Sequence, residues 1–248
     1  MHRDELLRYL DDLLAAREIQ DYSFNGLQVE GRAEVHRVVV GVSACAELFR
    51  IAIERGADAV LVHHGLLWQG QDPRIRGPLR DRIRLLLMHE LSLYAYHLPL
   101  DKHAELGNNA LAATALGLKD WQPFAGVGIL GSADGLSIDD VLRKVEELYG
   151  GYSGGPLVFR EGPEVIRKVA ILAGGGGKYV GEAILAGAEL MLTGEAAEPV
   201  LHLVREARMH FVAAGHYATE RLGVLALSDH LREALGLETL FVDVPNPV

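Results

Sequence analysis

Two adjacent histidines, His63 and His64, follow the apolar run AVLV at residues 59–62. Such a run predicts a buried strand. Neighbouring side chains on a strand point to opposite faces. The two histidines can therefore serve one site only where the strand ends and the chain turns, or where that site has two nearby centres.

Two further histidines are each followed by a carboxylate four residues later. His97 and Asp101 stand at the end of one predicted strand, and His216 and Glu220 stand at the end of another. In open parallel α/β sheets, functional groups gather at the carboxyl ends of the strands. We therefore expect both pairs to lie at such an edge, as the adjacent histidines do.

Imidazole nitrogen and carboxylate oxygen together are ligands for Zn, Fe, Mn or related divalent ions. Three or four histidines with two carboxylates exceed the need of one tetrahedral ion. They fit two ions at the ~3.5–4 Å separation of two-metal hydrolytic sites, with Asp101 as the best bridging ligand. Adjacent histidines could then each bind a different ion. The candidate site has these members: His63, His64, His97, Asp101, His216 and Glu220.

A single histidine at a strand end is more often a structural residue than a ligand. An adjacent pair together with two His-x-x-x-acid units weakens that explanation for the group as a whole. His97 has three open roles, as a ligand, as a residue that orients a ligand, or as a proton carrier. The histidines without such company are expected to be structural: His89, His103, His202, His210 and His230.

Strands and helices alternate in the first half, which predicts an α/β fold with a parallel sheet. The stretch 25–31 is expected to be a loop, because Asn25-Gly26 is a turn signal. Ser137 and Asp140 have capping-box spacing at the start of a predicted helix. Antiparallel pairing is an alternative in the middle of the chain. The predicted helices are 3–17, 46–57, 77–90, 109–117 and 137–150, and the predicted strands are 35–43, 58–64, 91–97, 124–131, 156–161 and 164–174.

The final third of the chain repeats the first. Residues 54–65 align with 185–196, so that Gly56 matches Gly187 and Asp58 matches Glu189. The flanking strands match as well, VVVGVS with VAILAG and YAYHLPLD with VAAGHYATE. Three matches in the same order indicate an internal duplication. We expect one module, residues 1–248, with two similar α/β lobes at about 1–124 and 125–248 and a metal cleft between them at the strand ends.

The glycine-rich stretch AGGGGKYVG (173–181) follows a strand and is similar to a phosphate-binding loop. Tyr179 stands where a P-loop has Ser or Thr, and Leu172 stands where it has its first glycine. We expect a turn before a helix, or backbone N–H groups that line the cleft. Cys45 is expected to be a small buried residue, because no neighbouring base marks it as a nucleophile.

The composition is that of a globular protein, with 49% hydrophobic and 23% charged residues. The formal net charge is −10 and no dense block of Lys and Arg occurs, which argues against nucleic acid as a partner. The single cysteine excludes an internal disulfide and a cysteine-based zinc site. The first 19 residues carry acids throughout, and no apolar run approaches the ~18 residues of a membrane span. We expect a cytoplasmic protein.

Five segments resemble the Nif-three-like family, whose members are also called GTP cyclohydrolase I type 2 homologues. They occur in the family's order over about residues 21–245: YSFNGLQVEG, HHG after an apolar strand, YHLPLD, AELMLTGEA and GHYATE. GHYATE with the upstream HH is the specific part. Gly65 replaces a proline that is frequent in the family, and Ser23 stands where an aspartate is usual. The chain is too short for the small domain that longer members insert.

The resemblance implies an α/β fold with two similar lobes, a dinuclear metal site between them and a ring-shaped homohexamer. It maps the metal ligands onto His63, His64, Asp101, His216 and Glu220, with His97 close by. It also implies a hydrolase acting on GTP, although no motif in the sequence identifies a guanine-binding site. A phosphoester substrate suits a two-metal cleft equally well. The alternative is a metal-binding scaffold without catalysis, in which the ions are structural or the ring carries a partner.

Overall fold

The computed structural model describes residues 1–150 and 155–248. They form two compact units, the first made of residues 1–103 with 223–244 and the second of residues 104–222 with 245–248. The lobes expected at 1–124 and 125–248 divide the chain differently. Residues 104–124 belong to the second unit because strand β5 (Lys119–Phe124) pairs with β6 (Gly128–Leu136) there. Residues 223–244 return to the first unit, where strand β11 (Glu238–Phe241) pairs with β2 (Arg37–Ser43).

The sheet of the first unit has the strand order β1-β4-β3-β2-β11. Strands β2, β3 and β4 run parallel, as predicted. Strand β11, which was not predicted, runs parallel to β2, and β1 is antiparallel to β4. The prediction of a loop at 25–31 is wrong in part, because residues 26–29 form strand β1. Strand β1 is only four residues long, which is too short to show the alternation of a strand beside the Asn-Gly turn signal. The strands are β1 (Gly26–Val29), β2 (Arg37–Ser43), β3 (Ala59–His64), β4 (Ser92–Ala95) and β11 (Glu238–Phe241).

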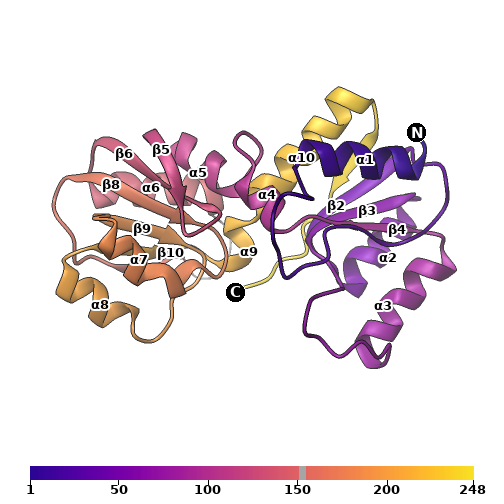
Figure 1. The fold of residues 1–248 in the computed structure, drawn as a ribbon, viewed down its shortest axis with the longest axis horizontal. Coiled ribbons are helices and arrows are strands. Elements are labelled where there is room, and N and C mark those ends of the chain that lie inside the picture. The colour runs from indigo at the N-terminus through magenta and orange to yellow at the C-terminus, as the bar shows by residue number, and fades with distance from the viewer. Residues whose placement is uncertain (151–154) are drawn as a thin grey trace. The chain divides into compact units, whose positions relative to one another are not determined.

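Helices cover both faces of this sheet (Figure 1). Helices α1 (Arg3–Leu13) and α10 (Arg221–Leu235) lie on one face, where the Tyr9 hydroxyl is 2.7 Å from Nε2 of His230. Helices α2 (Ala46–Glu54) and α3 (Gly77–Met88) lie on the other face.

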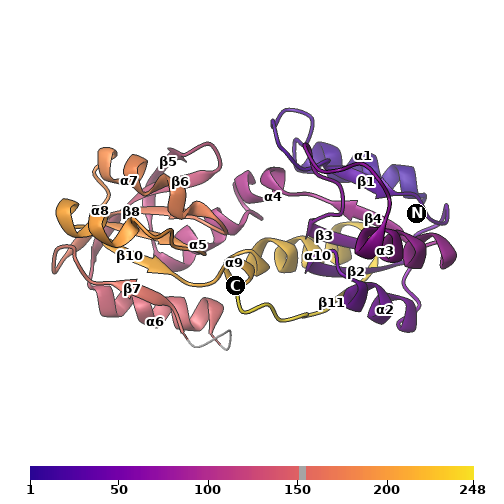
Figure 2. The ribbon, with the colours of Figure 1, turned by 90° about the horizontal axis from the view of Figure 1, so that it is seen from below.

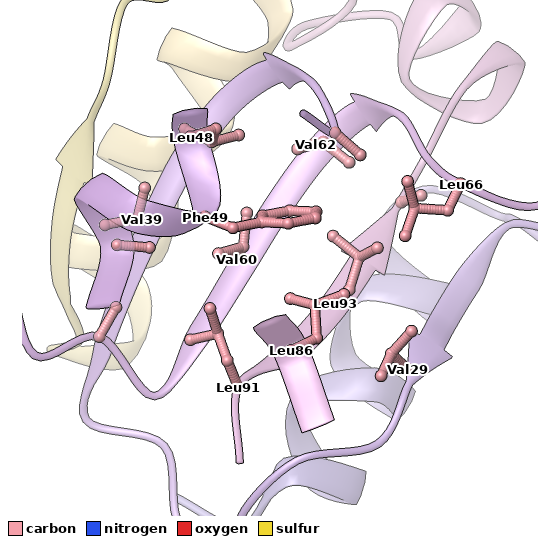
Figure 3. Packing of buried hydrophobic residues seen from close by; sticks show 14 residues of the cluster. Val29, Val39, Leu48, Phe49, Val60, Val62, Leu66, Leu86, Leu91 and Leu93 are labelled. Atoms are coloured by element: carbon pink, nitrogen blue, oxygen red, sulfur yellow. The ribbon is translucent and has the colours of Figure 1, made fainter. Parts of the chain in front are cut away.

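The core between α2, α3 and the sheet contains alternate residues of the parallel strands, among them Val39, Val60 and Leu93. Figure 3 shows Phe49 of α2 lying over Val60. Phe49 is fully buried, and burial of a side chain of this size contributes about 1.5–3 kcal/mol to stability. This packing holds the strands rigidly enough to position the side chains at their ends.

The sheet of the second unit has the order β5-β6-β8-β9-β10-β7, in which β8, β9 and β10 run parallel and the other pairs are antiparallel. The strand expected at 124–131 is instead a hairpin. Its turn includes Ala125 and Gly126, which have φ of 47° and 86°. The sequence has no polar residue at this turn, so residues 124–131 look like one continuous apolar segment. The strands are β5 (Lys119–Phe124), β6 (Gly128–Leu136), β7 (Leu157–Phe159), β8 (Ile166–Leu172), β9 (Leu190–Thr193) and β10 (His210–Ala213).

This second sheet also has a helix layer on each side. Helix α6 lies on one side and helices α7 and α8 on the other (Figure 2). The Ser137–Asp140 capping box predicted for α6 is confirmed, since the Ser137 hydroxyl accepts from the Asp140 N–H and the Asp140 carboxylate accepts from the Ser137 N–H. The helices are α5 (Asn108–Leu116), α6 (Ile138–Tyr149), α7 (Val180–Leu185), α8 (Val200–Ala207) and α9 (His216–Thr219).

The internal duplication is visible in the backbone contacts of matched residues. The Asp58 carboxylate accepts the N–H groups of His36 and Arg37 at the start of β2. The matched Glu189 accepts those of Arg167 and Lys168 at the start of β8. The three parallel strands β2-β3-β4 therefore correspond to β8-β9-β10, which confirms the predicted fold of two similar α/β halves.

Cys45 differs from its expected buried state. It is half-buried, and its Sγ caps α2 by accepting the N–H of Leu48 at 3.5 Å. Within residues 1–150 and 155–248, no helix combines the length and the apolar character needed to cross a bilayer.

Candidate metal centre

The end of β3 places His63 and His64 between two neighbouring strands. His63 is fully buried, and its Nδ1 lies 3.0 Å from the carbonyl oxygen of Tyr96, just beyond β4. His64 lies on the other side, with its Nδ1 3.2 Å from the hydroxyl of Ser43 at the end of β2. The ring centroids are nevertheless only 4.7 Å apart. Because a carbonyl only accepts, Nδ1 of His63 is the donor, and Nε2 carries the lone pair of the neutral ring.

His97 is held by a buried aspartate from the segment before β1. Its Nδ1 lies 2.9 Å from Oδ1 of Asp21, and its backbone N–H donates to Oδ1 of Asn25 at 2.8 Å. Asp21 also accepts from the N–H groups of Ser23 and Leu98 and from the Asn25 amide. Burial raises the pKa of the Asp21 carboxyl, but the hydrogen bonds from His97, Asn25 and Ser23 outweigh it and hold the pKa well below its usual range. The ionised carboxylate fixes the His97 ring with Nε2 turned away from it.

Asp101 completes this group from the short helix α4 (Leu98–Lys102), which begins directly after His97. Its Oδ2 lies 3.5 Å from Nε2 of His63, and the side chain is buried. His63, His64 and His97 each offer one ring nitrogen such that all three atoms lie within 4.8 Å of one another. The first unit thus places three imidazoles and a carboxylate at the carboxyl ends of β3 and β4.

His216 and Glu220 form a second group, in the second unit. Nε2 of His216 lies 3.2 Å from Oε2 of Glu220, one helical turn later, and its Nδ1 contacts Oε1 of Glu195. Burial lowers the pKa of the His216 imidazole, but hydrogen bonds and charge from Glu220 and Glu195 outweigh it and raise the pKa to about 9. Two carboxylates around one imidazole make this group attractive to a cation.

The glycine-rich loop supports the second group as a structural turn, in agreement with the first of its two expected roles. The carbonyl of Gly174 accepts the N–H groups of Gly176, Gly194 and Glu195. Gly174 has φ of 64°, and a Cβ there would collide with the Glu220 carboxylate and lie 3.0 Å from Nε2 of His216. Glycine is therefore required for the backbone to pass this close to the two side chains.

The six predicted residues thus form two groups, one in each unit. The sequence prediction missed two residues that contact them, Asp21 and Glu195. In the repeat alignment Glu195 stands opposite His64, and that match is a signal that could have found it. Two of the histidines expected to be structural are so: His210 bonds to the backbone of Gly162 and Pro163, and His230 bonds to Tyr9.

The donor chemistry of the first group fits a divalent cation. Neutral imidazoles present one lone pair each, and the Nδ1 donors of His63 and His97 leave Nε2 for this purpose. Buried carboxylate oxygen beside imidazole nitrogen is a donor set that divalent transition metals accept. The chain therefore carries a histidine–carboxylate group that could bind a metal ion.

Comparison with known proteins places the chain among its relatives. The family described as Duf34/NIF3 (NGG1p interacting factor 3) matches residues 1–247. The chain belongs to the Duf34/NIF3 family. A Pseudomonas aeruginosa relative, named GTP cyclohydrolase 1 type 2 homolog, is 44% identical over 98% of this chain and 96% of its own length. The solved structure of protein ybgI has a TM-score of 0.94 at 41% identity, and that of TTHA1606 from Thermus thermophilus has 0.90 at 38%; both pairs are covered in full.

Membership in the Duf34/NIF3 family confirms the resemblance seen in the sequence, and the structure shows the surroundings of both departures from the family pattern. A Cβ at Gly65 would overlap the side-chain amide of Gln28, whose Oε1 accepts the N–H groups of Leu66 and Leu67. Ser23, the second departure, donates its backbone N–H to the carboxylate of Asp21. Neither departure removes a predicted ligand.

Proposed function

We propose that the two groups together bind a pair of divalent metal ions and that the protein is a metal-dependent hydrolase. The ligands in this proposal are His63, His64, Asp101, His216 and Glu220. The observation that carries it is the cluster of ring nitrogens of His63, His64 and His97 within 4.8 Å of one another, with the buried Asp101 beside His63. Within this cluster His63 and His64 are the proposed ligands, and His97 lies next to them. Imidazole and carboxylate in this number exceed the need of one ion and suit two.

The proposed substrate is either GTP, attacked by water at the purine C8 as in a cyclohydrolase, or a phosphoester. The P. aeruginosa relative carries the name GTP cyclohydrolase 1 type 2 homolog, which supports a nucleotide substrate for this chain. A pair of bound ions would supply Lewis-acid activation of water and of the substrate. A hydrolytic reaction of either kind also needs a group that moves a proton.

His97 is the proposed proton-transfer residue. Its Nδ1 is held by the ionised Asp21, so Nε2 is the atom through which it would accept or release a proton. Asp21 stabilises the positively charged ring after protonation, and the N–H groups of Ser23 and Leu98 hold Asp21 in place. His97 can therefore change its protonation state without changing its orientation.

We propose further that the protein works in the cytoplasm as a homohexamer without a nucleic-acid partner. The net charge of −10 supports the last part of this statement, because a polyanion repels an acidic surface. Sedimentation at several protein concentrations would measure the assembly.

The decisive experiment combines metal analysis with turnover. We expect about two divalent ions per chain. We also expect hydrolysis of GTP or of bis(p-nitrophenyl) phosphate, and the rate should fall by about a hundredfold or more in His64→Ala and in His216→Ala. The exposed histidines His36 and His202 provide matched controls, His36→Ala and His202→Ala, which should keep metal and activity. Turnover that survives His64→Ala rejects the site. Bound metal that raises thermal stability without any turnover favours the scaffold instead.

A further inference from the structure

The first unit contains a cavity of about 370 Å³ next to the histidine group. Its walls come from the segment before β1, the loop after β3 and helix α3, and they include Phe24, Leu66, Leu67, Trp68, Leu79 and Ile83. This volume lies in the range of small-molecule sites, which are mostly apolar. Phe24 is 52% exposed, which leaves the cavity open to solvent at that side.

The walls of the cavity are held in place by hydrogen bonds between two loops. Gln28 accepts from the N–H groups of Leu66 and Leu67, and the N–H of Phe24 donates to the Leu67 carbonyl. Gln69 donates from its backbone to Tyr22 and from its side chain to the Asp21 carbonyl. The cavity is therefore formed before a ligand arrives, which lowers the entropic cost of binding.

The lining presents no uncompensated charge. Asp72 is the ionisable side chain among the lining residues, and it is paired with Arg74 at 2.7 Å and with Arg76 at 3.0 Å. The remaining side chains are apolar, aromatic or neutral amides. A charged group would lose its hydration here, and the lining offers no ionised side chain except the already paired Asp72, so the lining favours an uncharged ligand.

Trp68 connects the cavity with the histidines. Its ring centroid lies 5.2 Å from that of His97 in an edge-to-face arrangement and 6.0 Å from that of His64. The indole N–H donates to the Gly65 carbonyl, which fixes the ring. An aromatic ring bound against Trp68 would therefore lie one side chain away from the candidate metal centre, with the offset or edge contacts that aromatic pairs prefer.

We propose that this cavity binds a planar, uncharged heteroaromatic ring and that this ring is the non-reacting part of the substrate. The first statement stands on the cavity alone. The second rests on the proposed hydrolase in its phosphoester form, because a cyclohydrolase would attack the ring itself. Binding of a remote ring in a preformed pocket would orient the reacting group toward the histidines.

Trp68 also provides the measurement. The chain has two tryptophans, and Trp121 is partly exposed on β5 in the second unit, so Trp121→Phe leaves Trp68 as the sole indole fluorophore. The full chain, freed of metal by chelation, would be titrated with quinoxaline and with quinoxaline-2-carboxylate. We expect saturable quenching by quinoxaline and at least about tenfold weaker binding of the carboxylate.

Two variants test the cavity itself. Leu79→Phe fills it and Phe24→Ala removes an exposed wall without touching the core, and each should weaken quinoxaline binding by about tenfold. Leu87→Phe, on the same helix α3 but 57% exposed and outside the lining, should bind as the parent does. Quenching that does not saturate, or that is equal in Leu79→Phe and its parent, overturns the proposal.

The outcomes separate this proposal from the hydrolase. Quinoxaline binding without any turnover keeps the ring site and rejects the enzyme. Turnover whose KM is unchanged in Leu79→Phe rejects the ring as part of the substrate. If quinoxaline does not bind and Leu79→Phe instead changes the sedimentation coefficient, the cavity is an interface between copies of this chain and the proposal fails.

Discussion

The Asp21 carboxylate lies 2.9 Å from Nδ1 of His97, and both side chains are buried. The two residues are 76 positions apart in the chain, and Asp21 lies in an irregular segment between α1 and β1. A carboxylate behind a histidine is the usual device for fixing the tautomer and the orientation of a metal ligand or of a catalytic base. Asp21 is therefore a positioning residue for the candidate centre.

Replacing Asp21 with alanine should weaken both the fold and the metal site. It removes the acceptor for four donors, His97, Asn25, Ser23 and Leu98. We expect a loss of about 3 kcal/mol in the free energy of unfolding, measured with denaturant, and a loss of about 10–100-fold in metal affinity, measured against a chromophoric chelator. Asp81→Ala, at an exposed ion pair on α3, should change neither quantity appreciably. Unchanged metal affinity in Asp21→Ala would refute the positioning role.

Gly174 offers a test of the second group, because a methyl group added at its Cα would contact both Glu220 and His216. Gly174→Ala forces an L side chain into φ of 64° and drives its Cβ into the Glu220 carboxylate. We expect a cost of about 2 kcal/mol or more in stability together with weaker metal binding. Gly181→Ala is the matched control, since it lies in α7 with open space around its Cβ and should stabilise the helix by up to about 1 kcal/mol. Equal stability of the two variants would contradict this account.

Most of the candidate residues are marked in the sequence by a local pattern. His63 and His64 follow an apolar run, and His97 stands where β4 ends and α4 begins, so strand ends alone locate them. Asp21 has no such mark, because its role depends on a long-range contact with His97. Such contacts require the register of the strands, which no short stretch encodes.

The fold shows the same limit. The parallel strands were predicted because each carries its own apolar run, and the duplication was predicted because matched residues keep their spacing. The return of residues 223–244 to the first unit was not predicted. Strand β11 is only four residues long, and its pairing with β2 joins segments about two hundred positions apart. The hairpin of β5 and β6 was hidden by the apolar character of its turn.

The duplication predicts equal roles for Asp58 and Glu189. Each accepts two backbone N–H groups at the start of a parallel strand, so Asp58→Ala and Glu189→Ala should each cost about 1–3 kcal/mol. Hydrogen exchange should show faster opening of β2 in the first variant and of β8 in the second. The exposed acids Glu54 and Glu182, on the helices that precede them, serve as controls. A large effect of Asp58→Ala with none of Glu189→Ala would argue against equivalent halves.

Convergence of the two groups is the central requirement of the proposed centre, and cysteine chemistry can measure it. The chain has one cysteine, so Cys45→Ala gives a thiol-free background. In this background His64→Cys combined with His216→Cys should form an intramolecular cross-link with a short bifunctional maleimide. Side chains that bind the same two metal ions lie within a few side-chain lengths of one another. His36→Cys combined with His216→Cys pairs an exposed position with the same partner and should remain uncross-linked under equal conditions. Mass spectrometry of the digested monomer identifies the linked peptides. If the first pair reacts no faster than the second, His64 and His216 do not share a site, and the dinuclear centre must be abandoned in favour of a metal bound by the first group alone.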